Sequence, residues 1–124
     1  MTTAPESEQA ADPNLKARVA LFVRLEAIAG KEAELENFLR ASLPVVMHEA
    51  ATTVWFALRF GPTTFAIFDA FADEAGRQEH LAGRVAKSLK MRADDLLSEP
   101  PVIVEVDVLA AKLPVAEVNL CPGR

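Results

Sequence analysis

In four segments of the chain apolar residues occupy every second position, and two further segments carry apolar residues at helical spacing. The alternating segments are residues 18–27, 52–60, 63–71 and 102–109. The helical spacing is carried first by Leu35, Phe38, Leu39 and Ser42 and later by Leu81, Val85 and Leu89. Successive strand residues point to opposite faces of a sheet, whereas helix residues three or four apart share a face. The pattern therefore predicts the element order βαββαβ.

Turn and capping residues place the boundaries of these elements. Gly61 and Pro62 separate two strands closely enough to predict an antiparallel hairpin. Pro44 is expected to kink or end the first helix, because proline lacks an N–H group and clashes with the preceding turn. Asp73 is a suitable N-cap for the second helix, which is expected to continue towards Leu97 as one stretch and to stop before two prolines.

The strands are apolar on both faces, which is unusual for an antiparallel sheet with one face in water. In residues 63–71 one alternate set is Phe65, Ile67, Asp69 and Phe71, and the other is Ala66, Phe68 and Ala70. Two helices cover only one face of a four-stranded sheet. We therefore predict an α+β fold, a ferredoxin-like sandwich with helices on one face of the sheet. A second copy of the chain is expected to cover the other face, which gives a homodimer.

Length and composition restrict the classes of protein that the chain represents. Its 124 residues predict one domain over residues 15–113, with an acidic, disordered tail at 1–14 and a second tail at 114–124. The net charge of −5 argues against a nucleic-acid partner, and no apolar run reaches the ~20 residues that cross a membrane. The single cysteine, Cys121, excludes an internal disulfide, so a cytoplasmic location is the default, and its thiol is expected to be inert. Two histidines and one cysteine give no metal-ligand spacing.

Two local sequences add a family resemblance to this pattern. The stretch from Phe65 to Leu81 ends in His-Leu, and Asp95-Leu-Leu-Ser-Glu-Pro-Pro-Val102 opens a valine-rich last strand. Over about residues 18–113 the chain resembles the antibiotic biosynthesis monooxygenase domain family, whose members are dimeric α+β barrels. The resemblance implies a homodimer with a small pocket between helices and sheet in each subunit. Some members oxidise aromatic phenols or quinols with O2 and neither metal nor flavin, and others cleave haem.

The chain departs from the family at several positions. Phe71 stands where the family often has tryptophan or a polar aromatic residue. The chain contains no tyrosine, and its predicted strands contain no asparagine, although oxygenase members use these side chains around the pocket. Haem-cleaving members have an asparagine in the first strand, and its absence here argues against haem chemistry.

The two histidines are the first candidate site residues. His80 matches the family's helix histidine, and the ordinary histidine pKa near 6.5 suits a general base for a phenolic proton. The alternative is a histidine on the helix surface. If His80 is that base, His80→Ala is expected to lower turnover by about 10²-fold or more and to leave folding nearly intact, because the residue lies at the margin of the helix stripe. His48 follows the first helix and is a second candidate for contact with a pocket.

The second strand and the strand after the hairpin supply the remaining candidates. Trp55 and Arg59 share a strand face, so the indole could stack on an aromatic substrate while the guanidinium binds a phenolate or a superoxide-like anion. The alternative is an interface tryptophan beside an arginine whose charged end reaches water. A buried Asp69 needs a partner, for which Arg59 across the hairpin is the candidate. Phe68 and Phe71 are candidate ring contacts that also suit a core or an interface.

Taken together, these features predict a monooxygenase that needs no cofactor and acts on a small aromatic phenol or quinol with O2. An electron-rich phenolate passes an electron directly to O2, so the protein supplies a base, a dry pocket and positioning. A non-catalytic binding or stress-response module is the first alternative, and a cofactor-free isomerase or cyclase is the second. The fold alone does not choose among them.

Overall fold

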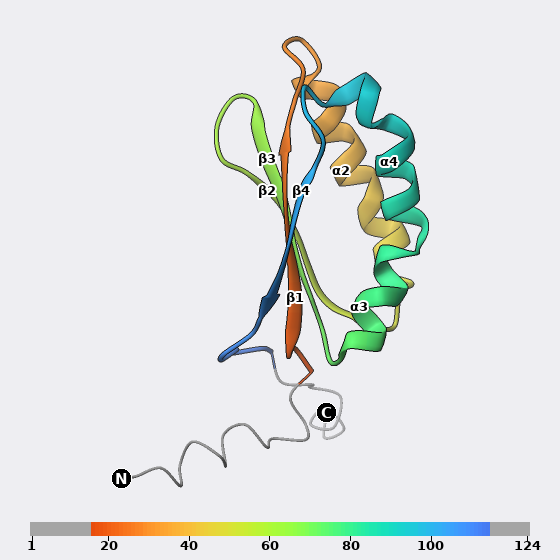
Figure 1. Ribbon diagram of the computed structural model, residues 1–124, viewed down its shortest axis with the longest axis vertical. Coiled ribbons are helices and arrows are strands. Elements are labelled where there is room, and N and C mark those ends of the chain that lie inside the picture. Colours follow the sequence, from red (N-terminus) through yellow and green to blue (C-terminus); the bar gives the residue numbers. More distant parts are fainter. Residues whose placement is uncertain (1–15, 115–124) are drawn as a thin grey trace, which may run out of the picture.

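The computed structural model describes residues 16–114, in which three helices cover one face of a four-stranded antiparallel sheet (Figure 1). The strands are β1 (Val19–Glu26), β2 (Thr52–Arg59), β3 (Thr64–Phe71) and β4 (Val102–Asp107), in the order β2-β3-β1-β4. The helices are α2 (Glu32–Val46), α3 (Glu74–Leu81) and α4 (Arg84–Leu96). The predicted ferredoxin-like α+β fold is confirmed.

The strand alternation sorts side chains into a helix-facing set and a set on the opposite face. On β3, Phe65, Ile67 and Phe71 belong to the core beneath the helices, whereas Ala70 and Phe68 belong to a smaller cluster on the other face. The helix-facing core also takes its most buried residues from β1, α2 and α4, namely Leu21, Leu25, Leu35 and Leu96. Asp69 therefore points toward the helices and not toward the uncovered face.

The uncovered face of the sheet is strongly apolar, and we call it the open face. Figure 1 shows all three helices on one side of the sheet and none on the other. Phe56, Phe60, Val102 and Val104 remain 43–57% exposed there. Phe22 stacks on Phe60, with ring centroids 6.2 Å apart. Both faces of the sheet are thus apolar: the helices cover one face, and the other is exposed in the single chain.

The second helical segment differs from the prediction of one continuous helix. It is divided into α3 and α4 at Ala82 and Gly83. Gly83 has an extended backbone conformation and its N–H donates to the His80 carbonyl at 2.9 Å. A Cβ at Gly83 would lie 3.3 Å from that carbonyl oxygen, so the small residue accommodates the break. The break makes α3 a separate element of two turns that ends beside His80.

Asp73 caps its helix as predicted, whereas the first helix does not end at Pro44. Asp73 caps α3, because its side chain accepts a hydrogen bond from the Gly76 N–H at 2.9 Å. Pro44 lies inside α2, which continues for two further residues to Val46 and ends in a turn that carries Glu49.

Arg77 fastens α3 to the sheet. Its side chain is 8% exposed, and its Nη1 donates to the carbonyls of Ala20 at 3.1 Å and Val106 at 3.4 Å. Its Nη2 pairs with Glu74 and lies 3.5 Å from Glu105. These contacts join α3 to β1 and β4, and so they set the position of His80 three residues later.

The predicted amino-terminal tail and Cys121 lie outside the described residues. Within residues 16–114, none of the helices has the length and apolar character needed to cross a membrane.

Candidate functional site

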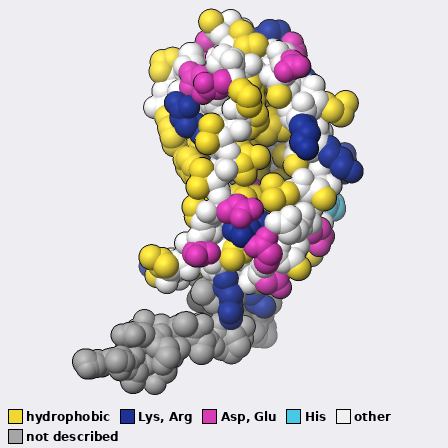
Figure 2. Space-filling view, viewed as in Figure 1, with side chains coloured by type: hydrophobic (Ala, Val, Ile, Leu, Met, Phe, Trp, Pro, Cys, Tyr) yellow, Lys and Arg dark blue, Asp and Glu magenta, His cyan; other side chains and the backbone are white. Residues whose placement is uncertain are grey.

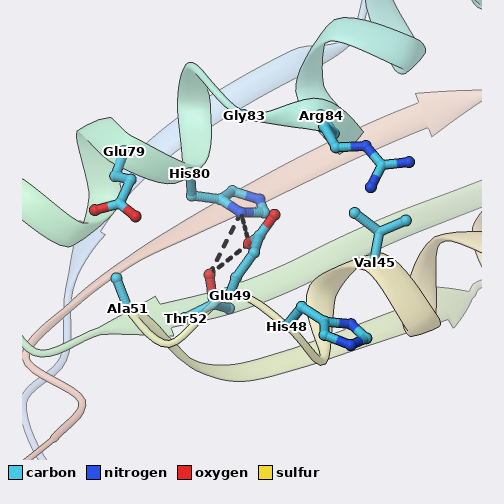
Figure 3. A pocket seen from close by; sticks show the side chains of 9 residues that line it. All are labelled: Val45, His48, Glu49, Ala51, Thr52, Glu79, His80, Gly83 and Arg84. Carbon is cyan, nitrogen blue, oxygen red and sulfur yellow. Dashed lines mark hydrogen bonds and ion pairs between the residues drawn. The ribbon is translucent and has the colours of Figure 1, made fainter.

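His80 lies between two carboxylates on the side of α3 that faces the sheet. Its Nδ1 is 2.7 Å from Glu49 Oε1, and its Nε2 is 3.0 Å from Asp69 Oδ2. Figure 3 shows the first of these contacts, with Glu49 reaching the ring from the turn before β2. The ring is buried, and it packs against Phe71 with centroids 5.4 Å apart. A histidine with a carboxylate on each nitrogen is the central feature of this site.

Three separate elements bring these groups together. Asp69 comes from β3, His80 from the last turn of α3, and Glu49 from the turn between α2 and β2. The hydroxyl of Thr52, the first residue of β2, donates to Glu49 Oε1 at 2.8 Å. That bond fixes the carboxylate of Glu49 against the histidine ring.

Burial and the two carboxylates act on the charge of His80 in opposite directions. Burial lowers its pKa, but the hydrogen bonds and negative charges of Asp69 and Glu49 outweigh burial and raise the pKa above 6.5. The carboxyl-terminal end of α3 also favours a positive charge at this position. A ring with a carboxylate on each nitrogen donates to both only as an imidazolium, so the geometry favours the charged form of His80.

Asp69 has one oxygen bound and one oxygen without a partner. The residue is 1% exposed, and Oδ2 faces the histidine. Oδ1 has no hydrogen-bond partner among the residues that the structure describes. A buried acceptor without a partner costs about 1–3 kcal/mol, so a hydrogen-bond donor placed at this oxygen would be stabilising.

An apolar cavity of about 320 Å³ lies beside Asp69 and His80, between the sheet and helices α3 and α4. Its volume is that of a small-molecule site. Figure 2 shows hydrophobic side chains gathered in the hollow between the sheet and the helical layer. The charged groups that line it are Asp69, His80 and Lys90. Its apolar lining includes Leu21, Ile67, Val85, Leu89 and Ile103.

A second, polar cavity of about 240 Å³ lies on the Glu49 side of the same histidine (Figure 3). His80 lines both cavities, whereas Glu49 lines only this one of the two and Asp69 only the apolar one. His48, a predicted pocket residue, lines this polar cavity and not the apolar one, and its Nδ1 lies 2.9 Å from the Pro44 carbonyl. Glu79 and Arg84 supply the remaining charged groups of its lining.

Arg59 lies apart from the histidine, and the expected pair of Arg59 with Asp69 is wrong. The guanidinium donates to Glu36 at 3.2 Å and to the turn carbonyls of Gly61 and Pro62. Arg59 pairs with Phe65 in the sheet register, four residues from Asp69, which is about 13 Å along a strand. Histidine, and not arginine, is the partner of Asp69.

The three candidate aromatic residues take different positions. Trp55 lies opposite Asp69 in the register and packs against the core, and its buried Nε1 has no partner among the described residues. Phe71 is fully buried and supports the ring of His80. Phe68 belongs to the cluster on the open face, so the sheet separates it from the apolar cavity.

Glu49, Thr52 and Lys90 are site residues that the sequence did not reveal. Glu49 lies 20 or more residues from both Asp69 and His80, in a turn with no hydrophobic period to orient it. Among residues 16–114, no three histidine, cysteine, aspartate or glutamate residues are placed to hold one metal ion.

Comparison with known proteins relates the chain to one protein at high identity and to others by fold. No family model and no curated protein matches it. A solved structure of a protein of unknown function from Nitrosomonas europaea is 57% identical, covers 82% of this chain and 98% of its own, and has a TM-score of 0.80.

Two further structures are named as candidate antibiotic biosynthesis monooxygenases. The one from Nitrosomonas europaea is 16% identical over 74% of this chain and 99% of its own, with a TM-score of 0.68. The one from Caulobacter crescentus is 17% identical over 77% and 92%, with a TM-score of 0.66. At these identities the likeness shows the shared fold.

Proposed function

We propose that this chain, which belongs to the same family as the Nitrosomonas europaea protein of unknown function, oxidises a small aromatic phenol or quinol with O2 and no cofactor. Some proteins of the same fold are named as candidate monooxygenases, which supports this class of reaction. The observation that carries the proposal is the free oxygen of Asp69 beside an apolar cavity. We also propose that two copies pack through their open faces.

The cavity suits a ligand with an apolar ring and one hydrogen-bond donor. Its apolar lining buries the ring, while Asp69 Oδ1 accepts the hydrogen bond of a phenolic hydroxyl. Because both nitrogens of His80 donate to carboxylates, the imidazolium has no lone pair for a substrate proton. We therefore assign the role of base to Asp69, and His80 stabilises its charge.

In the proposed reaction the bound phenol gives one electron to O2 and its proton to Asp69. A phenol that loses an electron becomes a much stronger acid, so a carboxylate is a sufficient base for this step. The ammonium of Lys90, which also lines the cavity, favours the superoxide that forms.

The two radicals then combine, forming a bond between oxygen and a ring carbon. The peroxide takes the proton back from Asp69 and becomes a hydroperoxide. The O–O bond then breaks and water leaves with the hydrogen of that ring carbon, which becomes a carbonyl carbon. The sum is phenol plus O2 giving quinone plus water, in which the ring is oxidised and O2 is reduced.

A cofactor-free isomerase or cyclase is the second candidate, because the same buried carboxylate would move a proton between two atoms of one ligand. That reaction consumes no O2. Oxygen consumption therefore separates the two candidates.

The test is oxygen uptake by the full chain with a panel of phenols and quinols, with the quinone product followed by its absorbance. Asp69→Asn removes the base and keeps the size of the side chain, so we expect turnover to fall by about 10²-fold or more. Asp107→Asn, an exposed aspartate on β4, is the matched control and should react as the unmodified protein does. No uptake with any member of the panel, or full activity in Asp69→Asn, would contradict the proposal.

A further inference from the structure

Glu49 contacts the histidine of the site from outside the apolar cavity. Its Oε1 is 2.7 Å from His80 Nδ1, and the residue lines the polar cavity only. We propose that Glu49 is a positioning residue, which holds His80 charged and oriented so that Asp69 meets its ligand as an anion with one oxygen free. The inference rests on the proposed function only for the identity of that ligand.

The burial of Asp69 makes the charge of His80 necessary. A carboxylate that is 1% exposed beside an apolar cavity is costly to ionise unless a cation faces it. Arg59 is engaged elsewhere, and the group that faces Asp69 Oδ2 is His80 Nε2 at 3.0 Å. If the ring became neutral, Asp69 would lose the positive charge that faces it. The second carboxylate, Glu49, opposes that loss because its negative charge also favours the imidazolium.

The contact with Glu49 also fixes the orientation of the ring. With Nδ1 held by Glu49, Nε2 is directed at one oxygen of Asp69 and leaves the other without a partner. Thr52 donates to the same Glu49 oxygen at 2.8 Å and so limits the movement of the carboxylate. The chain of contacts from Thr52 through Glu49 and His80 thus ends at Asp69 Oδ2, and the other oxygen of that carboxylate, Oδ1, is the one that we assign to the ligand.

Other charged and titratable groups face His80 across the polar cavity. These are Glu79 and His48, together with the guanidinium of Arg84. Figure 3 draws contacts to His80 from Glu49 and Thr52, and none from these three. Glu79 therefore offers a matched control: it is a glutamate of the same cavity, next to His80 in the sequence, whose carboxylate does not contact the ring.

The first experiment follows the titration of His80 by NMR of its ring in the full chain and in Glu49→Gln and Glu79→Gln. We expect the midpoint for His80 in Glu49→Gln to move to lower pH by about 1 pH unit or more, because an opposite charge in contact has been removed. Glu79→Gln should leave the midpoint close to that of the unmodified chain. Thr52→Val, which keeps Glu49 but removes its hydroxyl donor, should shift the midpoint less and is a second variant if Glu49→Gln does not fold.

The second experiment measures oxidation of the best phenol against pH. Activity should fall at high pH as His80 loses its charge, and Glu49→Gln should move that fall to lower pH with little change in KM at pH 6. A purely structural role would lower the thermal stability and leave both the midpoint and the pH profile in place, and that result would overturn the inference. If the unmodified chain oxidises nothing while the His80 midpoint still moves in Glu49→Gln, the positioning role stands and the proposed oxidation fails.

Discussion

The His80→Ala variant is expected to be less stable than the unmodified chain. The sequence alone predicted that its folding would stay nearly intact. The structure changes this prediction because His80 is buried and contacts two carboxylates. The substitution leaves Asp69, which is 1% exposed, as a buried carboxylate without the imidazolium that contacts it. It also removes the ring that packs against Phe71.

The magnitude follows from the cost of breaking a buried ion pair. Removing one partner of such a pair costs about 3–5 kcal/mol, because the remaining charge is uncompensated. For a domain of this size 1 kcal/mol lowers Tm by about 4–8 °C, so His80→Ala should lower Tm by more than about 10 °C near neutral pH.

The assay is thermal or urea unfolding of His80→Ala, of Asp69→Asn and of the double variant. Asparagine carries no charge, so the double variant should be more stable than the sum of the two single losses predicts. A His80→Ala protein that unfolds within about 1 kcal/mol of the unmodified chain would refute the reasoning, since most single substitutions already cost about that much. Additive losses in the double variant would show that the two side chains act independently.

Two further predictions follow from the fold and the charge of the site. Because the folded-state pKa of His80 is raised above 6.5, its stabilising contribution is fully present below that pH and is lost as pH rises through the raised pKa. Urea unfolding across pH 6 to 9 should show this decline, and His80→Gln should lack it. The open face predicts a homodimer, so light scattering should give twice the chain mass of 13.4 kDa, and Phe56→Glu should shift the protein toward the monomer. A monomeric unmodified chain at micromolar concentration would contradict the argument from strand patterning.

The sequence predicted the strands well because their information is local. The alternation in residues 63–71 separates Phe65 and Phe71 from Phe68, and the structure places these side chains on opposite faces. The capping role of Asp73 was equally local, since an N-cap side chain binds an N–H three residues later. Such signals lie within one turn or one strand, where spacing alone determines geometry.

The contacts of the site depended on long-range placement. Asp69 and His80 were both candidates, but their pairing requires α3 to lie over β3, which no spacing reveals. Arg59 was a reasonable partner for Asp69 by charge, yet the sheet register places it four residues away along β3. Glu49 lies in a turn, where apolar periodicity gives no orientation. The sequence pattern therefore does not reveal which polar side chains are buried together.

The break between α3 and α4 determines which residue of the helical segment faces the sheet. In a continuous helix the stripe of Val85 and Leu89 would extend back to Leu81, because each step of four residues returns to nearly the same face. The turn at Gly83 instead shifts the two helices by one residue, so His80 is buried at the end of α3 while Val85 and Leu89 are buried in α4. One residue corresponds to about 100° of rotation on a helix of 3.6 residues per turn. A related chain that kept every residue but ran one continuous helix through position 83 would keep its hydrophobic content and yet rotate His80 away from the sheet and bring Leu81 into its place.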